Sequence, residues 1–190
     1  MPRTATTPPR TAFADLPLGF TLLEALVVLA VLGVLLGLAV PTLKNLQAKH
    51  PLQAQAEVLL GSLLLARSEA IRRQQPITLC PRADQMCDLN APWQKGWLVF
   101  VDANHNARRD EGETLLEVRE PLPAKVFVGV TSTVKGYFSY GPEARSMATS
   151  GAFMAGTWRF CRDDLPQGWQ VVSNALGQPR LAGYAAATCP

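Results

Sequence analysis

The sequence is short of charge, of histidine and of closely spaced cysteines. Of its 190 residues 17% are charged, and 18 Lys and Arg against 15 Asp and Glu give a formal net charge of +3. This surplus is too small for a dedicated nucleic-acid-binding domain. There are two histidines, His50 and His105, and no C-x-x-C pair, nucleophile elbow, phosphate-binding glycine loop or H-E-x-x-H motif. We therefore expect no catalytic residue, no metal site and no cofactor.

Apolar residues are abundant by contrast, at 48%, and one segment concentrates them. Residues 20–40, FTLLEALVVLAVLGVLLGLAV, contain a single charge, Glu24. A helix of this length spans about 30 Å, the thickness of a bilayer core. The apolar core of a secretory signal peptide is shorter, about 7–15 residues, and no A-x-A cleavage site follows this segment. The pattern predicts a membrane-spanning helix that stays in the mature protein.

A polar leader rich in Pro and Thr, residues 1–19, precedes this segment. Its charges are Arg3, Arg10 and Asp15, and no further basic residue occurs before Lys44. Positive charge ahead of the first span favours a cytoplasmic N-terminus and an exported C-terminal part. We expect a single-pass protein of the cell inner membrane whose head lies in the periplasm.

Glu24 is costly inside a membrane span, by about 2.5–3.5 kcal/mol on insertion scales. Two interpretations are open. The carboxylate lies near the end of the span, where it reaches the lipid headgroups and favours the helix N-terminal dipole. Alternatively it is functional and pairs with a positive charge, because two opposite charges offset their desolvation only when they are paired.

The residues Gly19-Phe20-Thr21-Leu22-Leu23-Glu24, followed by an apolar helix, resemble the G-F-x-x-x-E processing motif of type IV pilins and type II secretion pseudopilins. The resemblance implies cleavage between Gly19 and Phe20 by prepilin peptidase, and methylation of the new N-terminus at Phe20. It also implies a partner for Glu24, the N-terminal ammonium of a neighbouring subunit. Pro41 matches the helix kink of this family, since proline removes a backbone hydrogen bond.

Beyond the apolar segment the pattern becomes amphipathic and then β-like. We expect one helix from Phe20 to about Gln74, bent at Pro41 and with Pro51 as a second candidate bend, in which residues 20–40 form the membrane and assembly helix and residues 41–75 the amphipathic part. After Pro76 come seven short β-type runs separated by turn residues. They are Ile77–Cys80, Trp97–Val101, Thr114–Arg119, Val126–Val130, Tyr137–Tyr140, Thr157–Cys161 and Trp169–Ser173. The sequence predicts an α+β fold, a long N-terminal helix packed against a mostly antiparallel β head, residues 76–190.

The four cysteines suit an exported head. Three pairings are open to them, of which the local one, Cys80–Cys87 with Cys161–Cys189, is the simplest. Disulfides persist in oxidising compartments such as the periplasm.

Three segments of the head resemble the GspH/FimT branch of the pilin superfamily. They are ARSEAIRRQQPITLCP at 66–81, WQKGWLVFVDANHNARRDEGETLL at 93–116 and GQPR at 177–180. The resemblance implies a non-catalytic minor pilin or pseudopilin that joins the tip of a filament and helps to initiate its assembly, for pilus biogenesis or protein secretion. Its partners would be other minor and major pilins or pseudopilins, prepilin peptidase and inner-membrane lipid. Type IV pilus and type II secretion pseudopilus both stay open.

Two further motifs suggest ligands. Asp102, Asn104, Asn106 and Glu113 follow the spacing of an EF-hand loop, but Ala107 stands where that loop needs glycine and two arginines follow it. A polar β-hairpin connection is the favoured interpretation, and a calcium-binding periplasmic domain the remote alternative.

The second motif concerns DNA. Some FimT-like pilins bind DNA through a C-terminal G-R-x-R motif, and this chain has Gly177-Gln178-Pro179-Arg180, so the first arginine is missing. Each lost phosphate contact weakens binding to DNA. Arg180 is the one candidate contact, and the alternative is that it only caps a strand.

Overall fold

A computed structural model describes residues 21–186 and 189, without the side chains of residues 36–50. The predicted leader, Gly19 and Phe20 lie outside the described residues. The chain divides after Leu43 into two units, and each is described by itself.

One helix, α1 (Leu22–Arg73), runs through both units. It ends one residue before the predicted end, and it continues through Pro41 and Pro51. The side chain of Pro41 lies outside the described residues, so its predicted kink stays a prediction. In the described part of the chain, no helical stretch is both long and apolar enough to cross a membrane. The predicted anchor at 20–40 extends past the described side chains at both ends and also stays a prediction.

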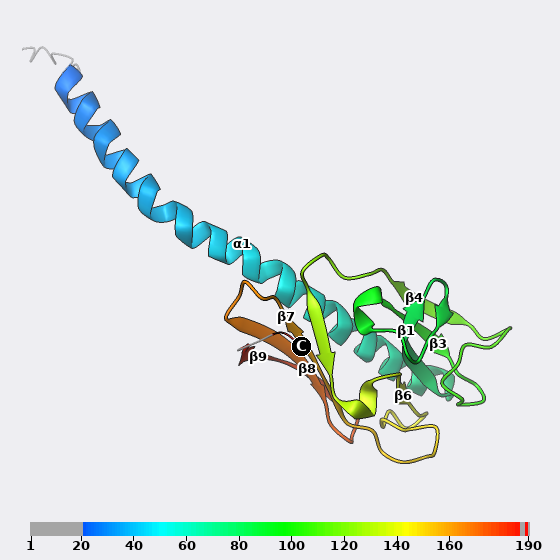
Figure 1. The fold of residues 1–190 in the computed structure, drawn as a ribbon. Helices are drawn as coiled ribbons and strands as arrows, with labels where there is room; N and C mark the ends of the chain where they lie inside the picture. The colour runs from blue at the N-terminus through cyan, green and yellow to red at the C-terminus, as the bar shows by residue number, and fades with distance from the viewer. Residues whose placement is uncertain (1–20, 187–188, 190) are drawn as a thin grey trace, which may run out of the picture. The chain divides into compact units, whose positions relative to one another are not determined.

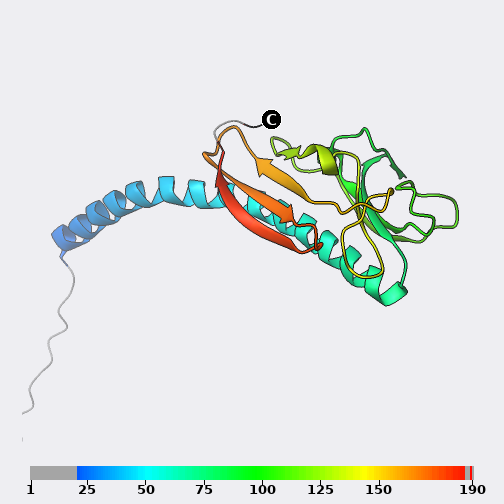
Figure 2. The ribbon, with the colours of Figure 1, turned by 90° about the horizontal axis from the view of Figure 1, so that it is seen from below.

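Nine antiparallel strands form two sheets in the described part of the head (Figures 1 and 2). The first sheet has the order β2-β1-β3-β4, and β6 pairs with the free side of β1. Its strands are β1 (Ile77–Ala83), β2 (Met86–Cys87), β3 (Trp97–Val101), β4 (Leu115–Arg119) and β6 (Phe138–Tyr140). The second sheet has the order β5-β7-β8-β9. Its strands are β5 (Phe127–Val130), β7 (Gly156–Cys161), β8 (Gln167–Ser173) and β9 (Pro179–Ala185).

The predicted α+β fold is the fold that the structure has, and all seven predicted strands are present to within three residues at each end. Two strands, β2 and β9, were not predicted. Short 3₁₀ turns, Trp93–Lys95 and Ser132–Val134, connect strands of the head.

The core lies between the head part of α1 and both sheets. Six helix residues at three- and four-residue steps face it and are almost fully buried: Leu52, Ala56, Leu59, Leu63, Ala66 and Ala70. This spacing follows from the 3.6-residue turn of the α-helix. Each fully buried leucine contributes about 1.5–3 kcal/mol to folding.

An aromatic cluster fills the space between the two sheets. The rings of Trp93 and Phe138 each meet the ring of Trp158 edge to face, with centroids 5.6 and 5.4 Å apart. The indole Nε1 of Trp97 donates a hydrogen bond of 3.0 Å to the buried hydroxyl of Ser62 on α1. This bond satisfies two buried polar groups at once, and it fixes how the helix is rotated against β3.

Candidate functional site

The first turn of α1 holds the predicted assembly residue, Glu24. The hydroxyl of Thr21 accepts a hydrogen bond from the backbone N–H of Glu24 at 3.2 Å, as a helix N-cap does. The carboxylate of Glu24 is exposed and lies in the first turn, where the helix dipole favours negative charge. The geometry of a single chain agrees with both interpretations of Glu24, because in the pairing interpretation the positive charge comes from a second subunit.

The segment that follows Glu24 exposes large apolar side chains. Ten leucines and valines between Leu22 and Leu35 have relative exposures of 46–82%. Such a helix, apolar on all sides, needs lipid or other protein around it.

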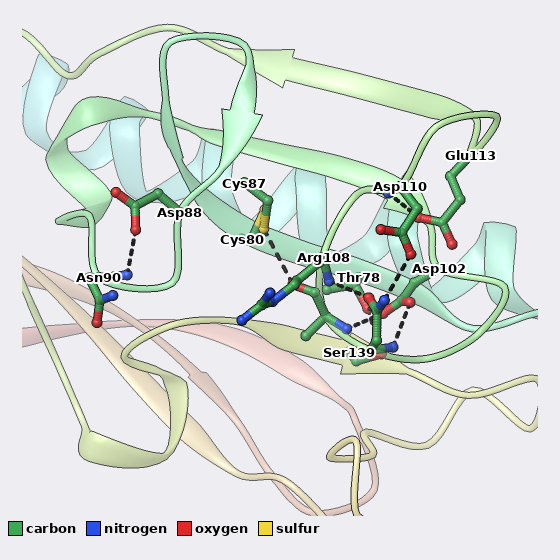
Figure 3. The surroundings of a disulfide bond; sticks show 12 residues. Thr78, Cys80, Cys87, Asp88, Asn90, Asp102, Arg108, Asp110, Glu113 and Ser139 are labelled. Atoms are coloured by element: carbon green, nitrogen blue, oxygen red, sulfur yellow. Dashed lines mark hydrogen bonds between the residues drawn. A yellow bond between two sulfur atoms is a disulfide. The ribbon is translucent and has the colours of Figure 1, made fainter.

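The loop with EF-hand spacing is built around Asp102, which is fully buried at the end of β3 (Figure 3). Its Oδ1 accepts the backbone N–H of Asn106 at 2.9 Å, and its Oδ2 accepts that of Ala107 at 3.0 Å. The hydroxyl of Thr78 on β1 donates to Oδ2 at 2.7 Å, and it also contacts the hydroxyl of Ser139 on β6 at 2.9 Å. Asp102 thus joins the loop directly to β1 and, through the hydroxyl of Thr78, to β6.

The outer half of this loop is also held by hydrogen bonds within the chain. The carboxylate of Glu113 accepts the backbone N–H groups of Ala103 and Asp110, both at 2.9 Å. The side-chain amides of Asn104 and Asn106 each donate to Oδ2 of Asp110 at 2.8 Å. These two bonds hold the pKa of Asp110 below its usual value.

The oxygens that would bind calcium therefore accept hydrogen bonds from the chain itself. Within the described ranges no group of three or more His, Cys, Asp or Glu residues is placed to hold a metal ion. Ala107, at the position where the EF-hand needs glycine, has the left-handed φ of 60°. The loop joins β3 to β4, which pair as antiparallel neighbours. It is the polar hairpin connection that the sequence predicted.

The segment Gly177–Arg180 comprises the last two residues of the turn and the first two residues of β9. Gly177 is buried with φ 71°, a left-handed conformation that favours glycine. A Cβ placed there would lie 2.7 Å from the ring of Tyr140 and 2.9 Å from the carbonyl oxygen of Ala144. The glycine of the suspected DNA motif is thus required by the fold.

Arg180 itself is exposed on the second residue of β9, opposite Val172. A second exposed arginine, Arg159 on β7, lies opposite Gln170, which in turn lies opposite Ala182. Because paired residues and residues two apart share a face of a sheet, Arg159 and Arg180 lie on one outer face. Sequence reasoning missed Arg159, although the alternation of Trp158, Arg159 and Phe160 was a signal for it.

The structure joins Cys80 to Cys87 and Cys161 to Cys189. These are the pairs expected as the simplest from local spacing. The first links β1 to β2 (Figure 3), and the second ties the end of the chain to β7. The second bond closes a loop of 28 residues, which stabilises the fold by about 3 kcal/mol or more in the chain-entropy model.

Comparisons with known proteins point to one family. Residues 55–177 match the family model "Type II transport protein GspH". A 95-residue segment is 42% identical to pilin-like protein PilA1 of Thermus thermophilus, covering 50% of this chain and 54% of that protein. The chain thus spans about half the length of this curated relative.

The fold resembles that of one solved minor pilin. Minor pilin FimU of Pseudomonas aeruginosa matches with a TM-score of 0.54 and 19% identity, over 76% of this chain and 99% of that one. The minor pseudopilin EpsH of Vibrio cholerae gives a TM-score of 0.46 with 14% identity, over 69% of this chain and 95% of that one.

A single long helix with an antiparallel β head defines a pilin-like protein, and the family match covers more than half of the chain. The chain belongs to the GspH family, whose members are minor pilins and pseudopilins of type IV pili and type II secretion systems.

Proposed function

We propose that this protein is a minor pilin or pseudopilin that joins a filament at or near its tip and helps to initiate its assembly, in pilus biogenesis or protein secretion. The observation that carries the proposal is the GspH match at 55–177, on the same chain as the Gly19-Phe20…Glu24 processing pattern. Its partners would be other pilins or pseudopilins, prepilin peptidase and inner-membrane lipid. It would cross the inner membrane once, with its N-terminus in the cytoplasm and its head in the periplasm.

The proposed function is non-catalytic. The exposed apolar helix at Leu22–Leu35 gives lipid contact before assembly and subunit contact after it, because either environment removes its side chains from water. The ammonium created at Phe20 and the carboxylate of Glu24 supply opposite charges that cannot be left unpaired in an apolar bundle. The head, with both disulfides, is the part presented to the periplasm.

Processing tests this proposal directly. We expect the mature chain to start at Phe20 with a methylated amine. Intact-mass measurement of protein extracted from membranes checks this, and peptide mapping of the N-terminus locates the methyl group. A mature form that still carries residues 1–19, or one that lacks residues 20–40, would contradict the proposal.

DNA binding is a second candidate function, favoured by the one outer face that Arg159 and Arg180 share. Gln178 stands where the motif of DNA-binding relatives has an arginine, so we expect weak binding of duplex DNA by the full chain. We expect Arg180→Ala and Arg159→Ala each to change affinity by less than about threefold. A salt series of binding measurements checks this. Tight binding with a salt slope that falls by about one in Arg180→Ala would favour DNA uptake instead.

A further inference from the structure

Strand β9, red in Figure 2, is an edge of the second sheet. The N–H of Ala186, just after this strand, donates to the carbonyl oxygen of Pro166 at 3.0 Å. Because the backbone groups of antiparallel strands alternate in direction, every second residue of β9 faces β8. The N–H and C=O groups of Leu181, Gly183 and Ala185 therefore point away from β8, and no hydrogen bond to them occurs among the described residues.

The other edges of the two sheets carry features that hinder the addition of a further strand. Short strands, charged side chains, irregular register and a covering loop all do so. β2 and β5 have two and four residues, and β4 carries Glu117 and Arg119 beside a shift in its register with β3. The free side of β6 is covered, since the N–H of Met147 donates to the carbonyl oxygen of Ser139 at 2.9 Å.

β9 lacks such protection over most of its length. It pairs with all seven residues of β8 without a register shift, and its one charge, Arg180, and its proline, Pro179, both lie at its start. Gly183 in its middle is exposed, and a Cβ there would have one neighbour, the carbonyl oxygen of Gly168 at 4.0 Å. The fold therefore does not require this glycine, and a glycine inside a strand often marks a place where another backbone approaches closely.

We propose that the open side of β9, residues 181–185, pairs with an extended segment of another protein. In such β-strand addition the backbone hydrogen bonds give affinity and the alternating side chains give specificity. Arg180 lies on the outer face and forms no ion pair within the described residues, whereas Leu181 packs against the core. The segment that fits has an acidic side chain beside Arg180 and an apolar one beside Leu181. This docking does not depend on the proposed function.

Crosslinking in the full chain, produced in its own host, tests the docking. p-Benzoylphenylalanine replaces Ala185, an exposed residue of β9, the cells are irradiated, and the adducts are mapped by mass spectrometry. We expect an adduct within an extended segment of another protein that contains an acidic residue. Adducts with lipid, with DNA or with a second copy of this chain overturn the proposal, as does the absence of any adduct.

A pair of variants at Gly183, each combined with the crosslinker, tests whether the backbone makes the contact. Gly183→Pro removes one outward N–H, and an edge strand tolerates proline where the N–H faces away from its neighbour, as at Pro179. We expect it to lower the adduct about tenfold, because one backbone hydrogen bond is lost and the proline ring takes its place. Gly183→Ala keeps the N–H and should leave the adduct unchanged. Equal yields in the two variants contradict strand addition.

A second pair of variants tests the charge, and it also decides the matter if purified Gly183→Pro melts well below the wild type. Arg180→Glu should lower the adduct about fivefold, because it places like charges on neighbouring strands. Arg159→Glu makes the same charge change on the same face, but β8 and β9 separate it from the open edge, so the adduct should be unchanged. Equal yields in Arg180→Glu and Arg159→Glu overturn the proposal.

Discussion

Replacing Glu24 by alanine is expected to yield a processed, membrane-resident chain that is absent from sheared filaments. The substitution removes a charge that costs about 2.5–3.5 kcal/mol within a membrane span, so insertion should be unchanged or slightly better. Cleavage after Gly19 should survive, because the peptidase meets the glycine before any neighbouring subunit is present. Immunoblots of membrane and filament fractions, with intact mass for processing, check each step.

The size of the loss separates the two interpretations of Glu24. If the carboxylate only favours the helix N-terminus, its removal costs about 0.3–1 kcal/mol and assembly stays close to the wild type. If it pairs with the ammonium of a neighbouring Phe20, the variant leaves that ammonium without a partner in an apolar bundle, at a cost of about 3–5 kcal/mol. A penalty of that size per contact removes the subunit from the filament.

The N-cap offers a matched control in the same turn. Thr21→Ala removes the hydroxyl that accepts the N–H of Glu24 but keeps the carboxylate. It should weaken the helix start by about 0.5–2 kcal/mol and leave the chain in filaments. Glu24→Ala protein recovered in filaments at wild-type levels would defeat the pairing interpretation, and an equal loss in both variants would assign Glu24 to the helix start alone.

The helix and seven strands could be predicted because their signals are local. Alternation of buried and exposed residues marks strands such as β7, and three- and four-residue steps mark the core face of α1. The disulfide pairs were also predictable, since each joins cysteines that are neighbours in the order of the four along the chain, 7 and 28 residues apart. The helix and strand patterns depend on residues a few positions apart, where a sequence pattern is most reliable.

The strand β9 was missed for a physical reason. It begins at Pro179 and contains Gly183, two residues that weaken a strand pattern. It is a strand because it pairs with all seven residues of β8, from Gln167 to Ser173. Proline is tolerated at its first position because β9 is an edge strand.

The candidate sites likewise depend on pairing between strands, which a local sequence pattern does not reveal. Arg159 joins the candidate face only because β8 pairs with both β7 and β9 and so places Arg159 and Arg180 on the same side of the sheet. Gly177 was interpreted as part of a binding motif, whereas the structure gives it a place in the turn before β9. In the pairing interpretation the partner of Glu24 belongs to another molecule, so the fold of one chain does not contain it.

Gly177→Ala is expected to destabilise the head by about 2–5 kcal/mol. Placing alanine in a left-handed conformation with φ 71° costs about 1–2 kcal/mol of conformational free energy. Its Cβ also meets the buried ring of Tyr140 at 2.7 Å and backbone atoms of Ala144 and Ser146 at 2.9 Å, which cannot all move aside. Overpacking of this kind costs a further 1–3 kcal/mol or so. Thermal unfolding of the full chain in detergent should show a midpoint lower by about 5–15 °C.

Gly112 provides the control for this variant. It has the left-handed φ of 89°, yet a Cβ there would meet nothing within 4 Å. Gly112→Ala should therefore lower the free energy of unfolding by about 1–2 kcal/mol, from backbone strain alone. The difference in stability loss between the two variants measures the clash with Tyr140 and the backbone of residues 144–146. Equal losses in both would show that the turn relaxes around the added methyl group and that the fold does not require the glycine. A larger loss of stability at Gly177 means that this glycine matters for the fold. Any change in DNA binding after its replacement then results from lost structure. Arg180→Ala is therefore the variant that tests a contact with DNA.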